Sequence, residues 1–496
     1  MGDLSRSIVI ITALIYDNLE RRDMRLGQTS VVHFGSRLIG SLLGFAATLY
    51  IARNLGGSVL GTYFLFVAVL IWLKTLFGSG IHYAIKKRLS ETDSDGGKLG
   101  AGILVQLVIY IVVVAGLLLF RDTVKNYLGF DRIWLLILGL GSMLALSLVS
   151  AALHGEQKVH LSALLRPLNV VIRSGIQIAV VLVGLLGGGL AGLAWGYIAG
   201  AAVAACAGII LLTIRPLRPS RADVYSILDF TRYSWLSGIE ERSFSALDTI
   251  ILGLFVSSNL IAYYEVAWNL ASLLAIFGTS LAQTLFPTIS QLDSEGDHEE
   301  VSSLVTDSLA YSGLFLIPGL VGGLMIGDIV LGVYGSEFKT ATIVLPILII
   351  ARLIYAYEAQ LISSLNAIGH PDTAFRVNLV FVSTNLGLNI VLVWLYGWVG
   401  AAVATATAAL IGFILAYAAL SQIITFEIPG REITYQWVAS ALMAAGIYGV
   451  DSVTVISISP VLDALVYVCL GTIVYFLALG VLSRQFRRTA RNNIPG

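Results

Sequence analysis

Charged residues are scarce in this sequence. Asp, Glu, Lys and Arg together account for 12% of the 496 residues, whereas a soluble domain carries roughly 25%. Hydrophobic residues account for 57%, and the mean hydropathy is +0.87. This composition excludes an ordinary soluble protein and predicts an integral membrane protein. The 30 basic and 30 acidic residues balance, so net charge indicates no partner. Without basic segments that alternate with aromatic residues, we expect no nucleic-acid binding.

Cysteines and catalytic motifs are also scarce. Cys206 and Cys469 are the two cysteines, and each lies in an apolar run without the spacing of a metal site or redox pair. We therefore expect two buried structural thiols. The chain has no His-Glu-x-x-His, no paired catalytic carboxylates and no nucleophile next to a base. We expect no catalytic residues, no metal site and no enzyme activity.

Hydrophobic segments of membrane-spanning length recur along the chain. Crossing a bilayer requires about 20 apolar residues, and fourteen segments approach or exceed that length. They predict an all-α polytopic membrane protein with about 14 transmembrane helices. The segments are 29–53, 59–84, 99–119, 132–154, 161–186, 190–213, 235–257, 260–287, 303–327, 341–365, 374–396, 398–423, 434–450 and 460–482.

The basic segment Ile214–Arg221 divides the chain. Its two prolines interrupt a helix, and its three arginines are not expected in hydrocarbon. Similar sequences flank it: Leu60–Tyr63 resembles Ile261–Tyr264, and the residues around Gly192 resemble those around Gly400. Such a repeat predicts two six-helix lobes of the same orientation, related by an axis along the membrane normal.

The predicted organisation follows from this duplication. Residues 8–15 are too short to span a membrane, and no small-residue cleavage site follows them, so we expect no signal peptide. The predicted parts are a cytoplasmic or interfacial N-terminal segment (1–28), the N-lobe with helices 1–6 (29–213), a cytoplasmic hinge loop (214–222), the C-lobe with helices 7–12 (223–423), helices 13 and 14 (424–482) and a basic cytoplasmic tail (483–496).

The distribution of Lys and Arg predicts the orientation. If the N-terminus is cytoplasmic, these residues are about three times as frequent in the inner loops as in the outer loops. This bias predicts a multi-pass protein of the cell membrane with both termini in the cytoplasm.

Two polar stripes occupy equivalent helices of the two halves. Arg166, Arg173 and Gln177 share one helix face, at positions i, i+7 and i+11. Asn378, Asn385 and Asn389 repeat this spacing in the eleventh segment. We expect the two stripes to form equivalent walls of one cavity.

Several charges lie deep in predicted spans. An arginine at the bilayer centre costs at least about 2.5–3.5 kcal/mol, so Arg173 should face water, a carboxylate or an anionic ligand. Lys74 and Asp248 lie at similar depth, and Arg352 nearly so.

Simpler explanations stay open for the charges nearer the surfaces. Arg37 and Arg166 lie near the cytoplasmic face, where snorkelling to the headgroups explains them equally well. Glu241 belongs to an acidic and basic cluster that could neutralise itself, and Glu265 could be hydrated near the outer surface.

Three groups of residues resemble a known family. They are Asp229–Ser237 with Leu247–Gly253 and Tyr264–Ala267, Gly369–Pro371 with Asn385–Leu392 and Tyr396–Thr405, and Ala52–Gly56 with Gly61–Tyr63. Through these motifs, residues 28–425 resemble the oligosaccharide-flippase branch of the multidrug/oligosaccharidyl-lipid/polysaccharide exporter superfamily. The lipid II flippase branch places charges after the Gly-Phe of its first helix, whereas here Gly44-Phe45 precedes two alanines.

The resemblance implies a function. Such proteins have two six-helix lobes, two trailing helices and a central cavity that is open to one side at a time. They move an undecaprenyl- or dolichyl-linked oligosaccharide from the cytoplasmic to the outer leaflet. Asp248 matches the family's acidic position before Ile-Ile-Leu-Gly.

The buried cations suit a diphosphate-linked substrate. Carboxylates at membrane depth suit a coupling ion, Na⁺ or H⁺. The predicted substrate-binding residues are Arg37, Lys74, Arg166, Arg173, Gln177, Arg352 and Asn385, and the predicted ion-coupling residues are Asp248, Glu241 and Glu265.

We expect as partners a polyprenyl-linked oligosaccharide, membrane lipids, and glycosyltransferases or a polymerase of the same pathway. Two alternatives stay open. A drug or organic-cation antiporter of the same superfamily should have a cavity dominated by carboxylates, whereas cations dominate the first half here. A polysaccharide polymerase or ligase should have a large external loop, whereas the longest external segments, near 120–132 and 328–340, have about a dozen residues.

Overall fold

The computed structural model describes residues 26–91, 96–183, 189–234, 239–453 and 459–493. It gives only the backbone for residues 26–43, 233–234, 239–243, 245, 451, 453 and 490–493. All regular structure in the described ranges is helical. This is expected in lipid, where no water is present to satisfy backbone N–H and C=O groups and a helix satisfies them within one segment.

The described helices follow the predicted segments in order. In the first half they are α2 (Leu26–Ser90), α3 (Gly96–Leu119), α4 (Arg121–Leu128), α5 (Ile133–Gly155), α6 (Val159–Val183), α7 (Gly189–Leu211) and α8 (Arg221–Ser234). In the second half they are α9 (Ile239–Phe255), α10 (Ser258–Leu274), α11 (Ile276–Glu295), α12 (His298–Ser312), α13 (Leu316–Gly332), the 3₁₀ helix η2 (Ser336–Thr342), α14 (Val344–Ala367), α15 (Pro371–Leu420), α16 (Gly430–Val453), α17 (Pro460–Leu482) and α18 (Arg484–Asn493).

Two of these elements each contain two predicted spans. Helix α2 bends at Gly56, with φ 77°, and α15 bends at Gly397, with φ 60°. Glycine adopts this left-handed region without the steric cost that other residues have. Gly56 separates spans one and two, at the start of the N-lobe, and Gly397 separates spans eleven and twelve, at the end of the C-lobe.

The all-α, multi-pass prediction is confirmed. Each of the fourteen predicted segments overlaps a helix. In the described part of the chain, nine helices qualify as membrane spans by length and hydropathy, or ten if the bent pair α10 and α11 forms one span. That count includes α15 once although it contains two segments, and it leaves out the short apolar helix 246–255. The number fourteen therefore stays a prediction.

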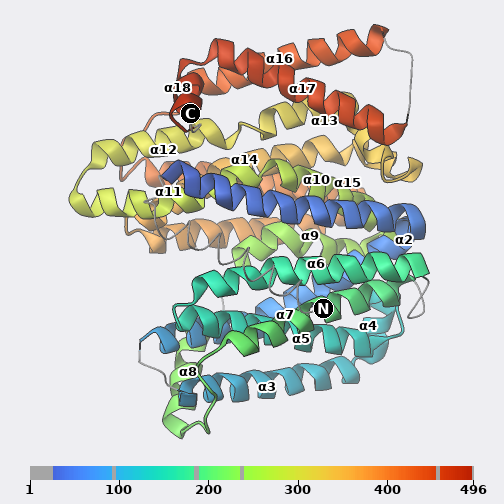
Figure 1. Cartoon of the computed structure of the whole chain (residues 1–496), viewed down its shortest axis with the longest axis vertical. Helices are drawn as coiled ribbons and strands as arrows, with labels where there is room; N and C mark the ends of the chain where they lie inside the picture. The colour runs from blue at the N-terminus through green and yellow to red at the C-terminus, as the bar shows by residue number, and fades with distance from the viewer. Residues whose placement is uncertain (1–25, 92–95, 184–188, 235–238, 454–458, 494–496) are drawn as a thin grey trace, which may run out of the picture.

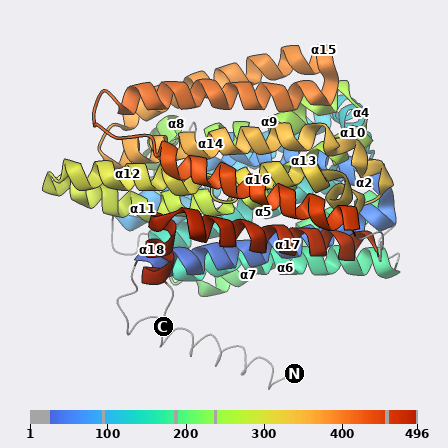
Figure 2. The same ribbon diagram turned by 90° about the horizontal axis from the view of Figure 1, so that it is seen from above.

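The helices form two groups that meet along α2. The long helices run in nearly the same direction in both views (Figures 1 and 2). Helices α3, α5, α6 and α7 lie together in the lower part of Figure 1, and α9 to α15 lie above them, with the first half of α2 (dark blue) drawn across the upper group. Helices α16 and α17 pack on α13, at the edge far from the N-lobe.

Helix α8 packs with the N-lobe, beside α2 and α3 (Figure 1). Its Ile227 is fully buried in a cluster with Ile85 and Leu99. The sequence assigned residues from 223 onward to the C-lobe, because no pattern within α8 indicates which lobe covers its apolar face.

The predicted hinge is attached to the N-lobe as well. The backbone N–H of Leu217 donates to the carbonyl of Gly96 over 2.9 Å. The Glu156 carboxylate accepts from the N–H of Ile214 at 2.7 Å and from Lys158 Nζ at 2.7 Å. Burial alone would raise the pKa of Glu156, but the Lys158 ammonium and the N–H groups of Ile214 and Thr213 outweigh it and lower that pKa.

The lobes contact each other at the end predicted to face outside. Arg53 Nε donates to the carbonyl of Val333 over 2.6 Å, and Glu337 Oε1 accepts from the N–H of Gly57 at 2.9 Å. The hydroxyls of Thr62 and Ser258 lie 3.1 Å apart. Short polar contacts around the bend of α2 therefore hold the two lobes together at this end.

The prediction of buried cysteines is wrong. Cys206 and Cys469 are both exposed free thiols. They lie on helix faces that no other described helix covers, and in a membrane protein such faces are as apolar as the core.

Candidate functional site

A buried carboxylate marks the C-lobe. Asp248 on α9 is 4% exposed. Its Oδ2 accepts hydrogen bonds from the hydroxyls of Tyr264 on α10 and Thr405 on α15, the latter at 2.7 Å. Its Oδ1 has no hydrogen-bond partner among the described residues. Asp248 therefore presents one oxygen that could bind a ligand.

Two buried asparagines of α15 complete this arrangement. Asn385 Nδ2 lies 3.5 Å from Thr405 Oγ1, and Asn389 Nδ2 donates to the Asn385 carbonyl over 3.1 Å. The Asn389 side chain lies beside the Asp248 carboxylate, and its Oδ1 also has no hydrogen-bond donor in the described structure. We call Asp248, Tyr264, Asn385, Asn389 and Thr405 the C-lobe cluster. Its spare buried oxygens suit a small cation, because hard cations prefer oxygen ligands.

Glu265 lies directly beside this cluster. Its carboxylate accepts a hydrogen bond from the hydroxyl of Thr249, the neighbour of Asp248. The Glu265 side chain is half-buried, and this hydrogen bond joins α10 to α9. Of the three predicted coupling carboxylates, Asp248 and Glu265 are thus brought together, while the Glu241 side chain lies outside the described residues.

A second polar cluster lies in the N-lobe. Gln177 on α6 is 3% exposed, and its Nε2 donates to Tyr63 Oη over 2.7 Å and to the Leu193 carbonyl over 2.9 Å. The half-buried guanidinium of Arg173 lies 5.4 Å from the centroid of the Tyr197 ring on α7. We call Tyr63, Arg173, Gln177 and Tyr197 the N-lobe cluster.

The two clusters occupy equivalent positions of the repeat. Tyr264 follows Tyr63 by 201 positions, and Thr405 follows Tyr197 by 208. Asn385 and Asn389 follow Arg173 and Gln177 by 212. The contact between Arg173 and Tyr197 joins helices five and six, as the contact between Asn385 and Thr405 joins helices eleven and twelve.

The clusters differ in charge. The N-lobe cluster contains a guanidinium, and the C-lobe cluster contains a carboxylate. The stripes predicted from sequence contain Arg173, Gln177, Asn385 and Asn389, but not Tyr63, Tyr197, Tyr264 or Thr405. The sequence repeat, in which Tyr63 corresponds to Tyr264 and Tyr197 to Thr405, is the signal that indicates these four residues.

Arg352, predicted to bind substrate together with Arg173, lies beside the C-lobe cluster instead. Its guanidinium lies 3.9 Å from the Trp268 ring centroid and 5.0 Å from that of Phe244. Its Nη2 donates to the hydroxyl of Ser272. It also interacts electrostatically with Asp248 and Glu265.

The remaining predicted residues are Lys74, Arg166 and Arg37. Lys74 is half-buried on α2 and interacts electrostatically with His82. Arg166 is exposed, which fits its snorkelling alternative. Arg37 lies on α2, but its side chain is outside the described residues.

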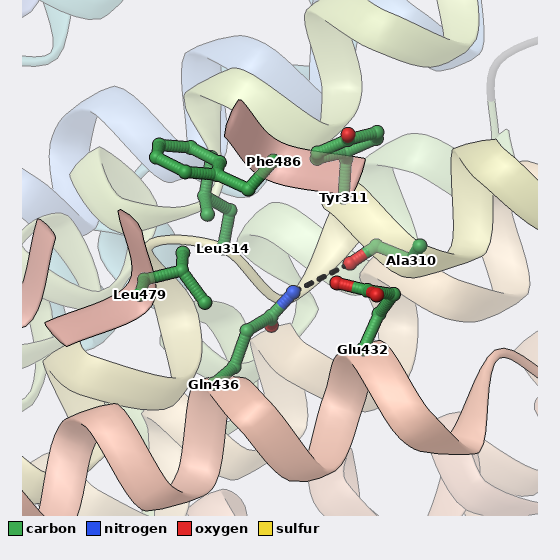
Figure 3. Close-up of a pocket in the computed structure, with 7 residues that line it drawn as sticks. All are labelled: Ala310, Tyr311, Leu314, Glu432, Gln436, Leu479 and Phe486. Carbon is green, nitrogen blue, oxygen red and sulfur yellow. Dashed lines mark hydrogen bonds between the residues drawn. The ribbon is translucent and has the colours of Figure 1, made fainter. Parts of the chain in front are cut away.

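A small pocket lies between α12, α16, α17 and α18. Gln436 reaches from α16 to the carbonyl of Ala310, over 2.7 Å, and Phe486 of α18 covers one side (Figure 3). Glu432 accepts from the Ser483 hydroxyl at 2.6 Å. These contacts hold the last three helices on the C-lobe, and the pocket includes no predicted site residue.

Comparisons with known proteins agree with this architecture. Residues 50–343 match the family described as "Polysaccharide biosynthesis protein". The "Probable flippase AglR" of Haloferax volcanii is 31% identical over 93% of this chain and 97% of its own length. The "Probable low-salt glycan biosynthesis flippase Agl15" of the same organism is 28% identical, over 95% of this chain and 99% of its own.

Solved structures share the fold. The lipid II flippase MurJ in an inward closed conformation has a TM-score of 0.78 and covers 92% of this chain and 99% of its own, at 16% identity. An inward-facing multidrug resistance MATE family transporter of the MOP superfamily has a TM-score of 0.63, at 16% identity, over 77% of this chain and 95% of its own. At this identity the likeness shows a common fold alone.

Proposed function

This chain belongs to the polysaccharide biosynthesis protein family, and from this premise we propose that it is a flippase. It moves a polyprenyl-(di)phosphate-linked oligosaccharide from the cytoplasmic to the outer leaflet by alternating access. The names of its relatives in Haloferax volcanii support a glycan flippase. The product serves assembly of a surface polysaccharide or glycoprotein, and glycosyltransferases or a polymerase of that pathway are the expected partners.

The observation that carries this proposal is the pair of oppositely charged clusters at equivalent positions of the repeat in the two lobes. A guanidinium binds phosphate oxygens through charge-assisted hydrogen bonds. Arg173, held at the Tyr197 ring, is the N-lobe group that would bind the phosphates during transfer. In an organic-cation antiporter the positive charge of Arg173 would repel the substrate.

The C-lobe cluster supplies the coupling ion site in this proposal. Asp248 Oδ1 and Asn389 Oδ1 would bind Na⁺, or Asp248 would bind H⁺. Glu265 contributes a second negative charge nearby. In the proposed orientation both termini lie in the cytoplasm. The end at which Arg53, Gly57 and Thr62 contact the C-lobe then faces outward.

A flipping assay tests the function. Proteoliposomes containing a fluorescent polyprenyl diphosphate glycan would be treated with a membrane-impermeant quencher, and the rate of exposure would be measured. Wild type should flip the lipid, and Arg173→Ala should slow it at least about tenfold, since a charge-assisted hydrogen bond contributes roughly 1.5–3 kcal/mol.

Arg376→Ala is the matched control, because Arg376 is exposed and pairs with Asp372 at 3.7 Å, near the start of α15. It should flip at the wild-type rate. Full activity of Arg173→Ala at equal protein level would remove Arg173 from the phosphate site. No flipping by the wild type, with the protein folded, would refute the function.

A further inference from the structure

Helix α18 has two chemically different faces. Helical periodicity places three residues without charge on one face: Gln485, Phe486 and Thr489. The opposite face carries three exposed arginines: Arg484, Arg487 and Arg488. The two faces of α18 can therefore bind different partners.

The uncharged face docks on the C-lobe. Gln485 Nε2 donates to Asp307 Oδ1 of α12 over 2.7 Å, and the hydroxyls of Thr489 and Tyr311 lie 2.8 Å apart. The Phe486 ring covers one side of the pocket in Figure 3. Because these contacts fix the rotation of α18 about its own axis, the arginine face is directed away from the C-lobe.

Two carboxylates beside the docked face bond to uncharged side chains. Asp307 accepts from Gln485, and Glu432 accepts from the Ser483 hydroxyl at 2.6 Å. In the described part of the chain, neither carboxylate accepts a hydrogen bond from an arginine of α18. The positive charge of α18 can therefore attract an anion outside the protein.

The arginine face begins where α17 leaves the lipid. Three apolar side chains at intervals of four residues are exposed along α17: Ile473, Leu477 and Val481. An exposed apolar stripe on a membrane helix faces the acyl chains. Arg484 follows Val481 by three residues, and Arg487 Nη1 donates back to the Val481 carbonyl over 2.7 Å. The arginines therefore lie at the level of the lipid headgroups.

The direction of α18 also suits a membrane surface. The backbone is extended at Ser483, with φ −96° and ψ 118°, so α18 does not continue the axis of α17. It lies across the ends of α16 and α17, at the same end of the molecule as α8 (Figure 1). A helix that lies along a membrane surface can present one face to the headgroups.

From these observations we infer that the arginine face of α18 binds the phosphate groups of anionic lipids in the adjoining leaflet. A guanidinium binds phosphate oxygens through two parallel hydrogen bonds, and a basic cluster directly after a membrane span attracts an anionic leaflet. The other face of α18 is bonded to α12, so these lipids hold the last helices on the C-lobe. The inference does not depend on the proposed function.

Hydrogen exchange in the full-length protein tests this site locally. The protein would be placed in nanodiscs of phosphatidylcholine alone or of phosphatidylcholine and phosphatidylglycerol in equal amounts. The measured quantity is the exchange rate of the backbone amides of α18, which reports local opening of that helix. Phosphatidylglycerol should slow this exchange at least about tenfold, because each basic residue near an anionic surface contributes to binding.

Replacing the three arginines by glutamine (Arg484→Gln, Arg487→Gln and Arg488→Gln) should give the same α18 exchange rate in both lipids. Replacing them by lysine should retain most of the slowing, because the charge remains. This second variant separates a loss of charge from a failure of α18 to fold.

The matched control removes three positive charges elsewhere, by Arg121→Gln, Lys125→Gln and Arg132→Gln. Arg121 and Lys125 already pair with Asp122 and Asp131, at 3.5 and 3.0 Å. This variant should retain the full slowing in α18.

Four results would overturn the inference. They are an α18 exchange rate in the wild type that is equal in both lipids, slowing that persists in the glutamine variant, slowing that the control variant loses, and equal slowing by inorganic phosphate in phosphatidylcholine alone. The last result would assign the arginines to a soluble anion instead of a lipid.

Discussion

Asp248 combines deep burial with a carboxylate oxygen that receives no hydrogen bond from the side chains and backbone that the structure describes. Buried polar atoms usually have partners, so an exception suggests a functional role. We predict that Asp248→Asn, which keeps an acceptor for Tyr264 and Thr405 but removes the charge, abolishes the dependence of flipping on a Na⁺ or H⁺ gradient. Flipping rates in proteoliposomes with and without each gradient would measure this.

Asp372→Asn is the control for this change, because Asp372 is an exposed carboxylate in the first turn of α15. It should preserve the gradient dependence. A gradient effect of wild-type size in Asp248→Asn would assign the ion to another group.

Thr405 holds the C-lobe cluster together through one hydroxyl. It donates to Asp248 and lies within 3.5 Å of Asn385 Nδ2. Thr405→Val keeps the shape but leaves a buried carboxylate with one donor fewer, and we expect a loss of about 1–3 kcal/mol in the free energy of unfolding. Denaturant titration of the reconstituted protein would measure it.

Thr407 offers a close comparison two residues away, where the hydroxyl donates to Val403 within the same helix over 2.8 Å. Thr407→Val should change stability by less than Thr405→Val. Equal effects would show that the hydroxyl of Thr405 is unimportant to the carboxylate.

At the scale of elements, the loop between α5 and α6 fixes the predicted hinge. Glu156 accepts from the N–H groups that follow α7, so it supports the end of that helix. Because its pKa is lowered on folding, its contribution is present above the unfolded pKa, near 4.5, and is lost as pH falls through the folded value.

We therefore predict that Glu156→Gln destabilises the protein by about 1–3 kcal/mol at pH 7, with the difference from wild type shrinking below about pH 4.5. Thermal unfolding across this pH range would measure it. Glu295→Gln, at an exposed position of α11, should show no comparable loss at pH 7. A difference that stays constant down to pH 3 would exclude the ionised carboxylate as the cause.

At the scale of the whole molecule, the lobes are closed at one end by contacts between α2 and the turn before α10. Close approach there requires glycine, since a Cβ at Gly61 would lie 1.7 Å from the carbonyl oxygen of Ser258. The alternating access that we propose requires this contact to open during each cycle. The hydroxyls of Thr62 and Ser258, 3.1 Å apart, offer a way to prevent that.

We predict that the pair Thr62→Cys and Ser258→Cys, with both native cysteines replaced by alanine, forms a disulfide on oxidation, because the two side chains already meet. The oxidised protein should lose flipping, and a reductant should restore it. The Thr62→Cys variant alone should flip under both conditions. Undiminished flipping by the cross-linked protein would contradict alternating access at this contact.

Local patterns in the sequence determined the class of this protein and the equivalence of its two halves. Hydropathy determined a multi-pass helical protein, since a chain in lipid must bond its own backbone. The repeat and the stripes around Arg173 and Asn385 determined which helices are equivalent, because helical periodicity places residues on faces without reference to neighbours.

Tertiary structure decided what these patterns do not contain. Asp248 is met by Tyr264 from the next helix and by Thr405 from α15, 157 positions later. Arg352 joins that carboxylate cluster, and α8 packs on the N-lobe. The cysteines show the physical reason: in a membrane, a face toward lipid and a face toward another helix are equally apolar, so composition predicts insertion but not partners.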